Sequence, residues 1–66
     1  MEREEKAMKY AIYFTWGNYE EDSFIVNNAK ERDSNIKELI DRKEFKEILY
    51  CKIYKNGEYG RRIKVL

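Results

Sequence analysis

The residues best suited to chemistry in this sequence are aromatic and basic, and they gather in its last third. Residues 48–66 contain five basic side chains against one acidic side chain, although the whole chain has a net charge of only +1. The candidate binding residues are Tyr50, Lys52, Tyr54, Tyr59 and Arg61. Tyrosine and arginine are favoured anchors of protein interfaces, and tyrosines between basic groups also stack unpaired bases and neutralise phosphates. These residue types predict binding.

The side chains that usually carry catalysis are scarce. The sequence has no histidine, which removes the usual general base near neutral pH and the commonest metal ligand. Cys51 is the only cysteine and lies in a run of strand-forming residues, where we expect a small buried apolar side chain. The acidic cluster Glu20–Asp22 lacks the alternating oxygen ligands of a calcium loop. We therefore expect a non-enzymatic chain with no metal site and no cofactor.

The candidate residues belong to a predicted β-hairpin formed by residues 48–55 and 58–66. Asn56-Gly57 favours a two-residue turn with positive φ at both positions. With this turn as the anchor, the predicted pairs are Tyr54 with Tyr59, Lys52 with Arg61, Tyr50 with Ile63, and Ile48 with Val65. All five candidate residues then share one face of the hairpin, because side chains alternate along a strand.

A single helix can cover only one face of this hairpin. Leu49, Cys51 and Ile53 lie on the face opposite the candidate residues and are compact and uncharged, so we expect the helix to pack on their side. The aromatic and basic face would then stay open, with more aromatic surface than a monomer usually exposes. A bulge at Gly60 would invert this assignment for the last strand.

The first half of the chain predicts a second hairpin. Residues 8–16 are rich in aromatic and β-branched side chains, and the larger ones share one parity, which predicts a strand. Residues 23–26 form the next predicted strand. With a loop over residues 17–21, Phe14 lies opposite Phe24 and Ile12 opposite Val26.

A helix is predicted between the two hairpins. Asn28 followed by Glu31 resembles a capping box, and Ile36, Leu39 and Ile40 lie near one side of a helix over residues 29–42. Phe45 follows in a charged connector, where we expect it to plug the end of the helix.

These elements predict one small α+β domain over residues 7–66, in the order ββαββ, after a charged tail of residues 1–6. We expect a four-stranded, mainly antiparallel sheet with the helix packed on one face. The spatial orders 2-1-3-4 and 1-2-4-3 both satisfy antiparallel pairing. A chain of 66 residues is too short for a second core.

Composition bears on location and partners. One cysteine cannot form an internal disulfide, which argues against the class of small secreted proteins. The longest uncharged stretch, residues 10–19, is too short and polar to span a bilayer. We expect a cytoplasmic chain with no membrane contact that binds another protein, including a second copy of itself. Nucleic acid, single-stranded or RNA, is the alternative partner and is disfavoured by the near-neutral charge.

Overall fold

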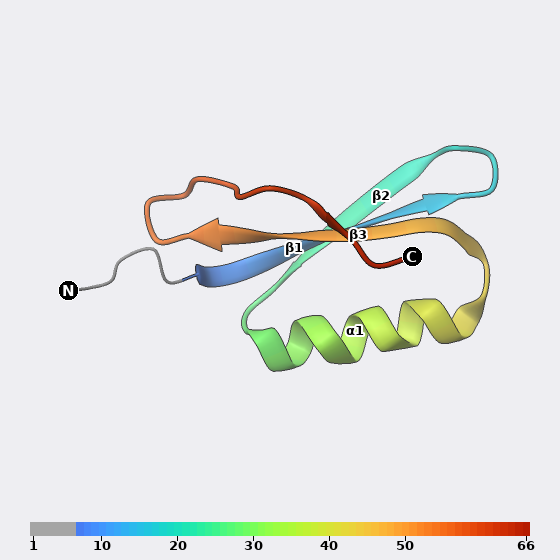
Figure 1. The fold of residues 1–66 in the computed structure, drawn as a ribbon. Coiled ribbons are helices and arrows are strands. Elements are labelled where there is room, and N and C mark those ends of the chain that lie inside the picture. The colour runs from blue at the N-terminus through green and yellow to red at the C-terminus, as the bar shows by residue number, and fades with distance from the viewer. Residues whose placement is uncertain (1–6) are drawn as a thin grey trace.

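The computed structural model describes residues 7–66, and the predicted tail of residues 1–6 lies outside this range. Its elements are β1 (Ala7–Trp16), β2 (Glu21–Val26), α1 (Ala29–Arg42), β3 (Phe45–Tyr54) and β4 (Ile63–Lys64). The four strands of this range form one sheet in the order β2-β1-β3-β4, and every neighbouring pair is antiparallel (Figure 1). The predicted α+β fold is confirmed, and the structure selects the order 2-1-3-4.

The first hairpin is tighter than predicted. Tyr19 N–H donates to the Trp16 carbonyl (2.9 Å), Trp16 N–H donates to the Glu20 carbonyl (2.8 Å), and Tyr19 takes the left-handed conformation at φ 70°. This short turn shifts the register by two residues, so that Phe14 pairs with Asp22 and not with Phe24. A shift of two keeps every side chain on its expected face.

The second hairpin closes in the same way, and the predicted two-residue turn is wrong. Gly57 N–H donates to the Tyr54 carbonyl and Tyr54 N–H to the Glu58 carbonyl, both at 2.8 Å. Only Gly57 has a positive φ, because Asn56 keeps an ordinary conformation in which its Oδ1 accepts from Glu58 N–H (3.0 Å). Asparagine side chains often stabilise turns through such bonds.

The different turn changes which side chains share a face. Ile53 now bridges Tyr59, where the prediction paired Tyr59 with Tyr54. One extra residue between this bridge and β4 restores the predicted pair of Tyr50 with Ile63. This irregularity has the effect of a bulge, as the sequence allowed near Gly60.

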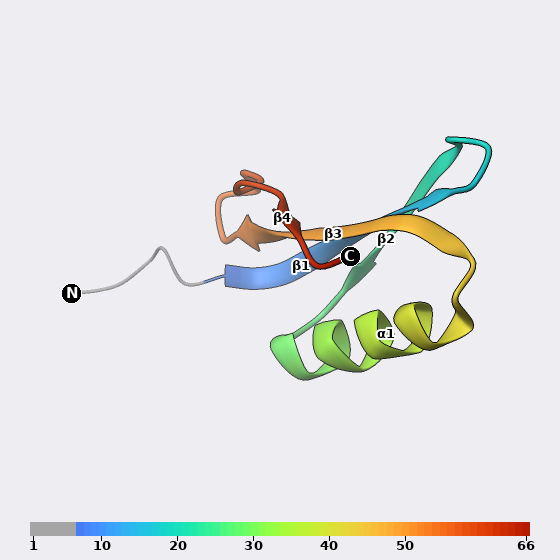
Figure 2. The same cartoon turned by 45° about the vertical axis from the view of Figure 1, so that its right-hand side comes forward.

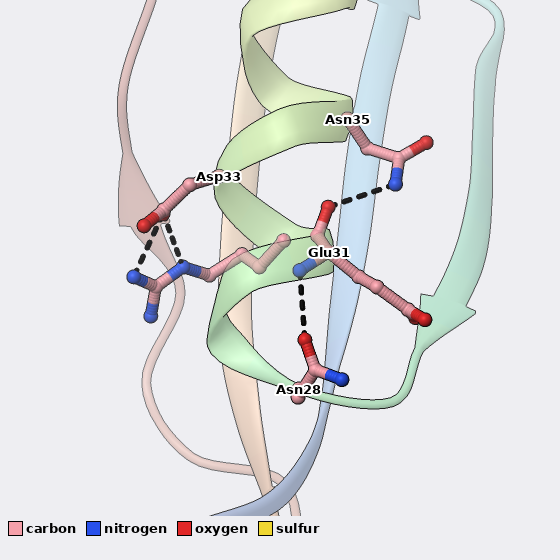
Figure 3. Close-up of polar contacts among 5 residues, drawn as sticks. Asn28, Glu31, Asp33 and Asn35 are labelled. Carbon is pink, nitrogen blue, oxygen red and sulfur yellow. Dashed lines mark hydrogen bonds and ion pairs between the residues drawn. The ribbon is translucent and has the colours of Figure 1, made fainter.

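Helix α1 has the predicted bounds. Asn28 Oδ1 accepts from Glu31 N–H (2.8 Å; Figure 3). The Glu31 carboxylate accepts from Asn27 N–H (2.9 Å), so both bonds satisfy donors at the start of the helix. At the other end, Lys43 adopts the left-handed conformation at φ 55°, and its N–H donates to the Ile40 carbonyl (3.1 Å). The capping residues therefore fix both ends.

The helix packs on the face that we expected to be open. Ile36 and Leu39 of α1 join the main core on the sheet face defined by Ile12 and Ile48, which we call the covered face (Figures 1 and 2). Leu49, Cys51 and Ile53 were predicted to contact the helix, but they lie on the opposite side of β3. The pairing of Ile12 with Tyr50 and of Phe14 with Ile48 decides this, because it places the bulkiest apolar side chains of β1 and β3 together.

Phe45 is the first residue of β3 and is buried in the core. Its ring meets the rings of Phe14 (centroids 4.9 Å apart) and Trp16 (4.7 Å) edge to face. Such aromatic pairs add stability beyond the area that they bury. Phe45 therefore seals the core near the end of the helix, as expected, but from within the sheet.

Candidate binding surfaces

Tyr50, the first candidate residue, is occupied by contacts within the protein. It lies on the covered face, and the guanidinium carbon of Arg32 from α1 is 4.9 Å from the centre of its ring and 4.6 Å from that of Tyr10. Asp33 holds the same guanidinium through a 2.8 Å ion pair. Burial alone would lower the pKa of Arg32, but the hydrogen bond and charge of Asp33 raise it above its usual value. Arg32 therefore closes one end of the core between two tyrosines.

The other four candidate residues do not form one surface. Tyr54 is half-buried, and its ring lies so close to Gly60 that a Cβ there would be 3.3 Å from it. Tyr59 is exposed and pairs with Ile53, on the face opposite Tyr54. Lys52 and Arg61 are exposed. The prediction that the candidate residues share one face of the hairpin is therefore wrong. A role in binding stays a prediction for each of them.

The sheet face away from the helix, which we call the open face, carries a second small cluster. Ala11, Cys51 and Ile53 are buried there, and Tyr13 packs against them. Cys51 is 1% exposed, in line with its expected structural role, and its Sγ lies 3.7 Å from the Tyr13 hydroxyl. Burial, followed by the contact with Cys51, raises the pKa of Tyr13, while Arg62 acts in the opposite direction.

Arg62 extends across the open face from the C-terminal segment. Its guanidinium carbon is 3.7 Å from the centre of the Tyr13 ring on β1, and its Nη1 is 3.3 Å from Glu21 Oε2 on β2. Because β3 lies between β1 and β4, this side chain crosses a whole strand. The Arg62 side chain therefore links the C-terminal segment to the far edge of the sheet.

The basic last third is partly neutralised by this arrangement. Arg62 pairs with Glu21, and Lys64 Nζ is 3.4 Å from Glu47 Oε2. Sequence reasoning missed both pairs, because they join residues that are far apart in the chain. The open face is consequently less positive than the C-terminal sequence implies.

The structure exposes apolar side chains that the sequence analysis missed. Four aliphatic side chains, three at the end of the chain around β4 and one on α1, are between 37% and 45% exposed; we call them the C-terminal strip. They are Ile40, Ile63, Val65 and Leu66. The signal was present in the alternation of Arg62 to Val65, basic then apolar, which is typical of a strand with two different faces.

The strip lies beside the helix and not under it. Helix α1 contacts β1 and β3, whereas β4 lies on the outer side of β3. In Figure 3, Asp33 projects from the side of α1 that faces β4, and Asn35 projects from the side that faces β2. Ile40 follows Asp33 by about two helical turns and so lies on the same side. Ile63 shares the covered face through its pairing with Tyr50.

No protein-family model, curated protein or solved structure matches this chain. Within residues 7–66, no group of three or more acidic, histidine or cysteine side chains could hold a metal ion. The helix of this range is not long and apolar enough to cross a membrane.

Proposed function

We propose that this protein is a small non-enzymatic module that binds another protein, and that the C-terminal strip is its contact surface. The observation that carries the proposal is the exposure of Ile63, Val65 and Leu66 along one edge of the sheet and of Ile40 on the side of α1 toward that edge, each more than a third exposed. Contiguous exposed apolar surface is typical of sites where proteins interact. The aromatic and basic residues predicted from the sequence would contribute only at its margin, through Tyr50.

Charge supports a protein partner over a nucleic acid. The net charge of the chain is only +1, which gives little general attraction to phosphates. The rings of Tyr10 and Tyr50 are in contact with Arg32 and are not free to stack on bases. A nucleic-acid site would need free cations and free aromatic faces together. The single buried thiol of Cys51 supports a cytoplasmic location, where thiols stay reduced.

The test compares recovery of partners by the wild-type chain and by the double variant Ile63→Ser/Val65→Ser. Each tagged chain is incubated with an extract of its source cells treated with nuclease, and bound proteins are quantified by mass spectrometry. We expect a partner whose recovery falls at least ~10-fold in the variant, a change equivalent to about 1.4 kcal/mol. Sedimentation of the purified chain tests whether that partner is a second copy.

Ile25→Ser is the matched control. Ile25 is 54% exposed, but it lies on β2 at the other edge of the sheet and pairs with Ala11 of the open face. The control should keep the partner. Equal recovery by wild type and double variant, or equal loss in the control, contradicts the proposal. In a parallel extract without nuclease, recovery of nucleic acid that falls steeply with rising salt supports the alternative class of partner.

A further inference from the structure

The two outer strands of the sheet differ in how they present their free backbone groups. On β2, the Glu20 carbonyl accepts from Trp16 N–H. Because successive residues direct their backbone groups alternately toward and away from the neighbouring strand, the Ser23 amide points away from β1 and toward the free edge. The Asp22 carboxylate binds that amide at 2.8 Å. Acidic residues at Glu21 and Asp22 further guard this edge against pairing. The free edge of β2 is therefore protected by its own side chains.

The free edge of β4 has the opposite character. Val65 N–H donates to the Ile48 carbonyl (2.9 Å), so the neighbouring Lys64 amide points away from β3. Along this edge, Ile63 and Val65 lie on the covered face as part of the C-terminal strip, and Lys64 lies on the open face. The Arg62 side chain is turned inward over β1 and away from this edge. A strand added here would meet apolar neighbours on one side and the Lys64 ammonium group on the other.

We propose that β4 binds an extended segment of a partner protein that alternates acidic and apolar residues, by adding it as a fifth strand beside Lys64. Its apolar side chains would pack on Ile63 and Val65 next to α1, and its carboxylates would face Lys64 on the open face. Cross-strand pairs of these kinds stabilise a sheet, and strand addition at a sheet edge is a common mode of peptide recognition. This inference rests on the proposed function and names the chemistry of its partner.

Charge decides between this occupant and a second copy. Pairing of β4 with β4 of another copy would place Arg62 and Lys64 beside the same two residues, and like charges directly opposite destabilise a sheet. Pairing with β2 of another copy would require release of Ser23 from Asp22. The ion pairs of Arg62 and Lys64 with Glu21 and Glu47 do not exclude an acidic partner, because exposed pairs contribute little.

The probe is a blocked peptide of about six residues, the usual length of a strand, in which glutamate and isoleucine alternate. Two control peptides are used: one alternates lysine and isoleucine, and the other has the composition of the probe with its glutamates grouped at one end. Affinity is measured by titration calorimetry, and backbone contact by amide hydrogen exchange. We expect the probe to bind at least ~10-fold more tightly than either control. At about ten times its dissociation constant, it should slow exchange of the Lys64 amide ~10-fold, leaving Ser23 unchanged.

Lys64→Gln supplies the matched variant, because Lys64 is exposed and a neutral side chain places no like charge beside Glu47. The variant should lose the preference for the acidic probe, whereas Lys30→Gln, the same charge change on α1, should keep it. Failure of the probe to bind, protection at Ser23, or equal binding of the grouped control overturns the inference. If the probe fails while Ile63→Ser/Val65→Ser still loses a cellular partner, strand addition is wrong and the proposed function stands. If the probe binds as expected but no cellular partner depends on the strip, the proposed function is wrong.

Discussion

The two faces of the sheet are closed by different means. On the covered face, a helix from elsewhere in the chain buries Ile12, Ile48 and a group of aromatic rings. On the open face, Tyr13 packs against a smaller cluster around Cys51, and Arg62 lies over the Tyr13 ring. A packed helix excludes water from a wide area of the sheet, whereas a single side chain protects only the few residues that it contacts. The first face should therefore control global stability, and the second should control local opening.

The largest expected effect comes from equal truncations on the two faces of β3. Ile48→Ala truncates a fully buried side chain beneath α1, and Ile53→Ala truncates a side chain on the open face that is 9% exposed. Large-to-small changes in cores cost about 2–5 kcal/mol. We expect about 4 kcal/mol for Ile48→Ala and about 2 kcal/mol for Ile53→Ala, since the open face can relax around the gap. Urea unfolding measures both, and equal losses would show that the faces do not differ.

The next effect compares two arginines that each lie over tyrosine. Arg32 is held between Tyr10 and Tyr50 with its side chain 19% exposed, whereas Arg62 lies over Tyr13 with its side chain 48% exposed. Cation–π contacts contribute about 0.5–1 kcal/mol when exposed and about 2 kcal/mol when desolvated. We expect Arg32→Met to cost about 1–2 kcal/mol and Arg62→Met about 0.5 kcal/mol in thermal unfolding.

Labelling of the Cys51 thiol separates local opening from global unfolding in the same two variants. Arg62→Met should increase the labelling rate by more than its loss of stability explains, because Arg62 lies over Tyr13, whose hydroxyl is next to the thiol. Arg32→Met should increase it only in proportion to the loss of stability, because it acts on the other face. Equal behaviour of the two variants would mean that Cys51 is reached only through global unfolding.

Local sequence signals predicted the features that depend on residues close together in the chain, namely the start of the helix and the position of the second hairpin. Asn28 and Glu31 fixed the start of the helix because their side chains bind donors within the same turn. Asn56-Gly57 indicated the position of the second hairpin but not its turn type. In the structure, Asn56 keeps a negative φ and its side chain accepts from Glu58 N–H. The resulting turn places Tyr59 on the open face.

Contacts between distant strands could not be predicted in the same way. Both faces of β3 carry apolar residues, so β3 alone does not indicate where the helix packs. The register with β1 decides it, by placing Ile12 opposite Tyr50 and Ala11 opposite Cys51. The reach of Arg62 over β3 to Tyr13 likewise depends on the strand order, which the sequence left open. The C-terminal strip follows from the same order, because β4 lies beyond the cover of α1.

The smallest effect is a change of stability at high pH that comes from the open face. Burial, and then the contact with Cys51, raises the pKa of Tyr13 in the folded protein, while an unfolded tyrosine titrates near pH 10. Folding therefore favours the neutral form of Tyr13. The contribution of neutral Tyr13 to the free energy of unfolding is complete below about pH 10 and is lost as the pH rises through the pKa of the folded protein. Tyr13→Phe should remove this part of the decline in unfolding free energy.

Two further variants identify the cause of the Tyr13 shift by NMR titration of its ring carbon. Cys51→Ala should move the pKa of Tyr13 back toward its ordinary value, because both contributions of the thiol raise it. Arg62→Met should move it further up, because the guanidinium favours the tyrosinate. Arg32→Met, on the covered face, is the control and should leave it unchanged. A shift of similar size in all three variants would mean that the open face does not hold Tyr13 through these two contacts, and that its titration follows the stability of the whole sheet.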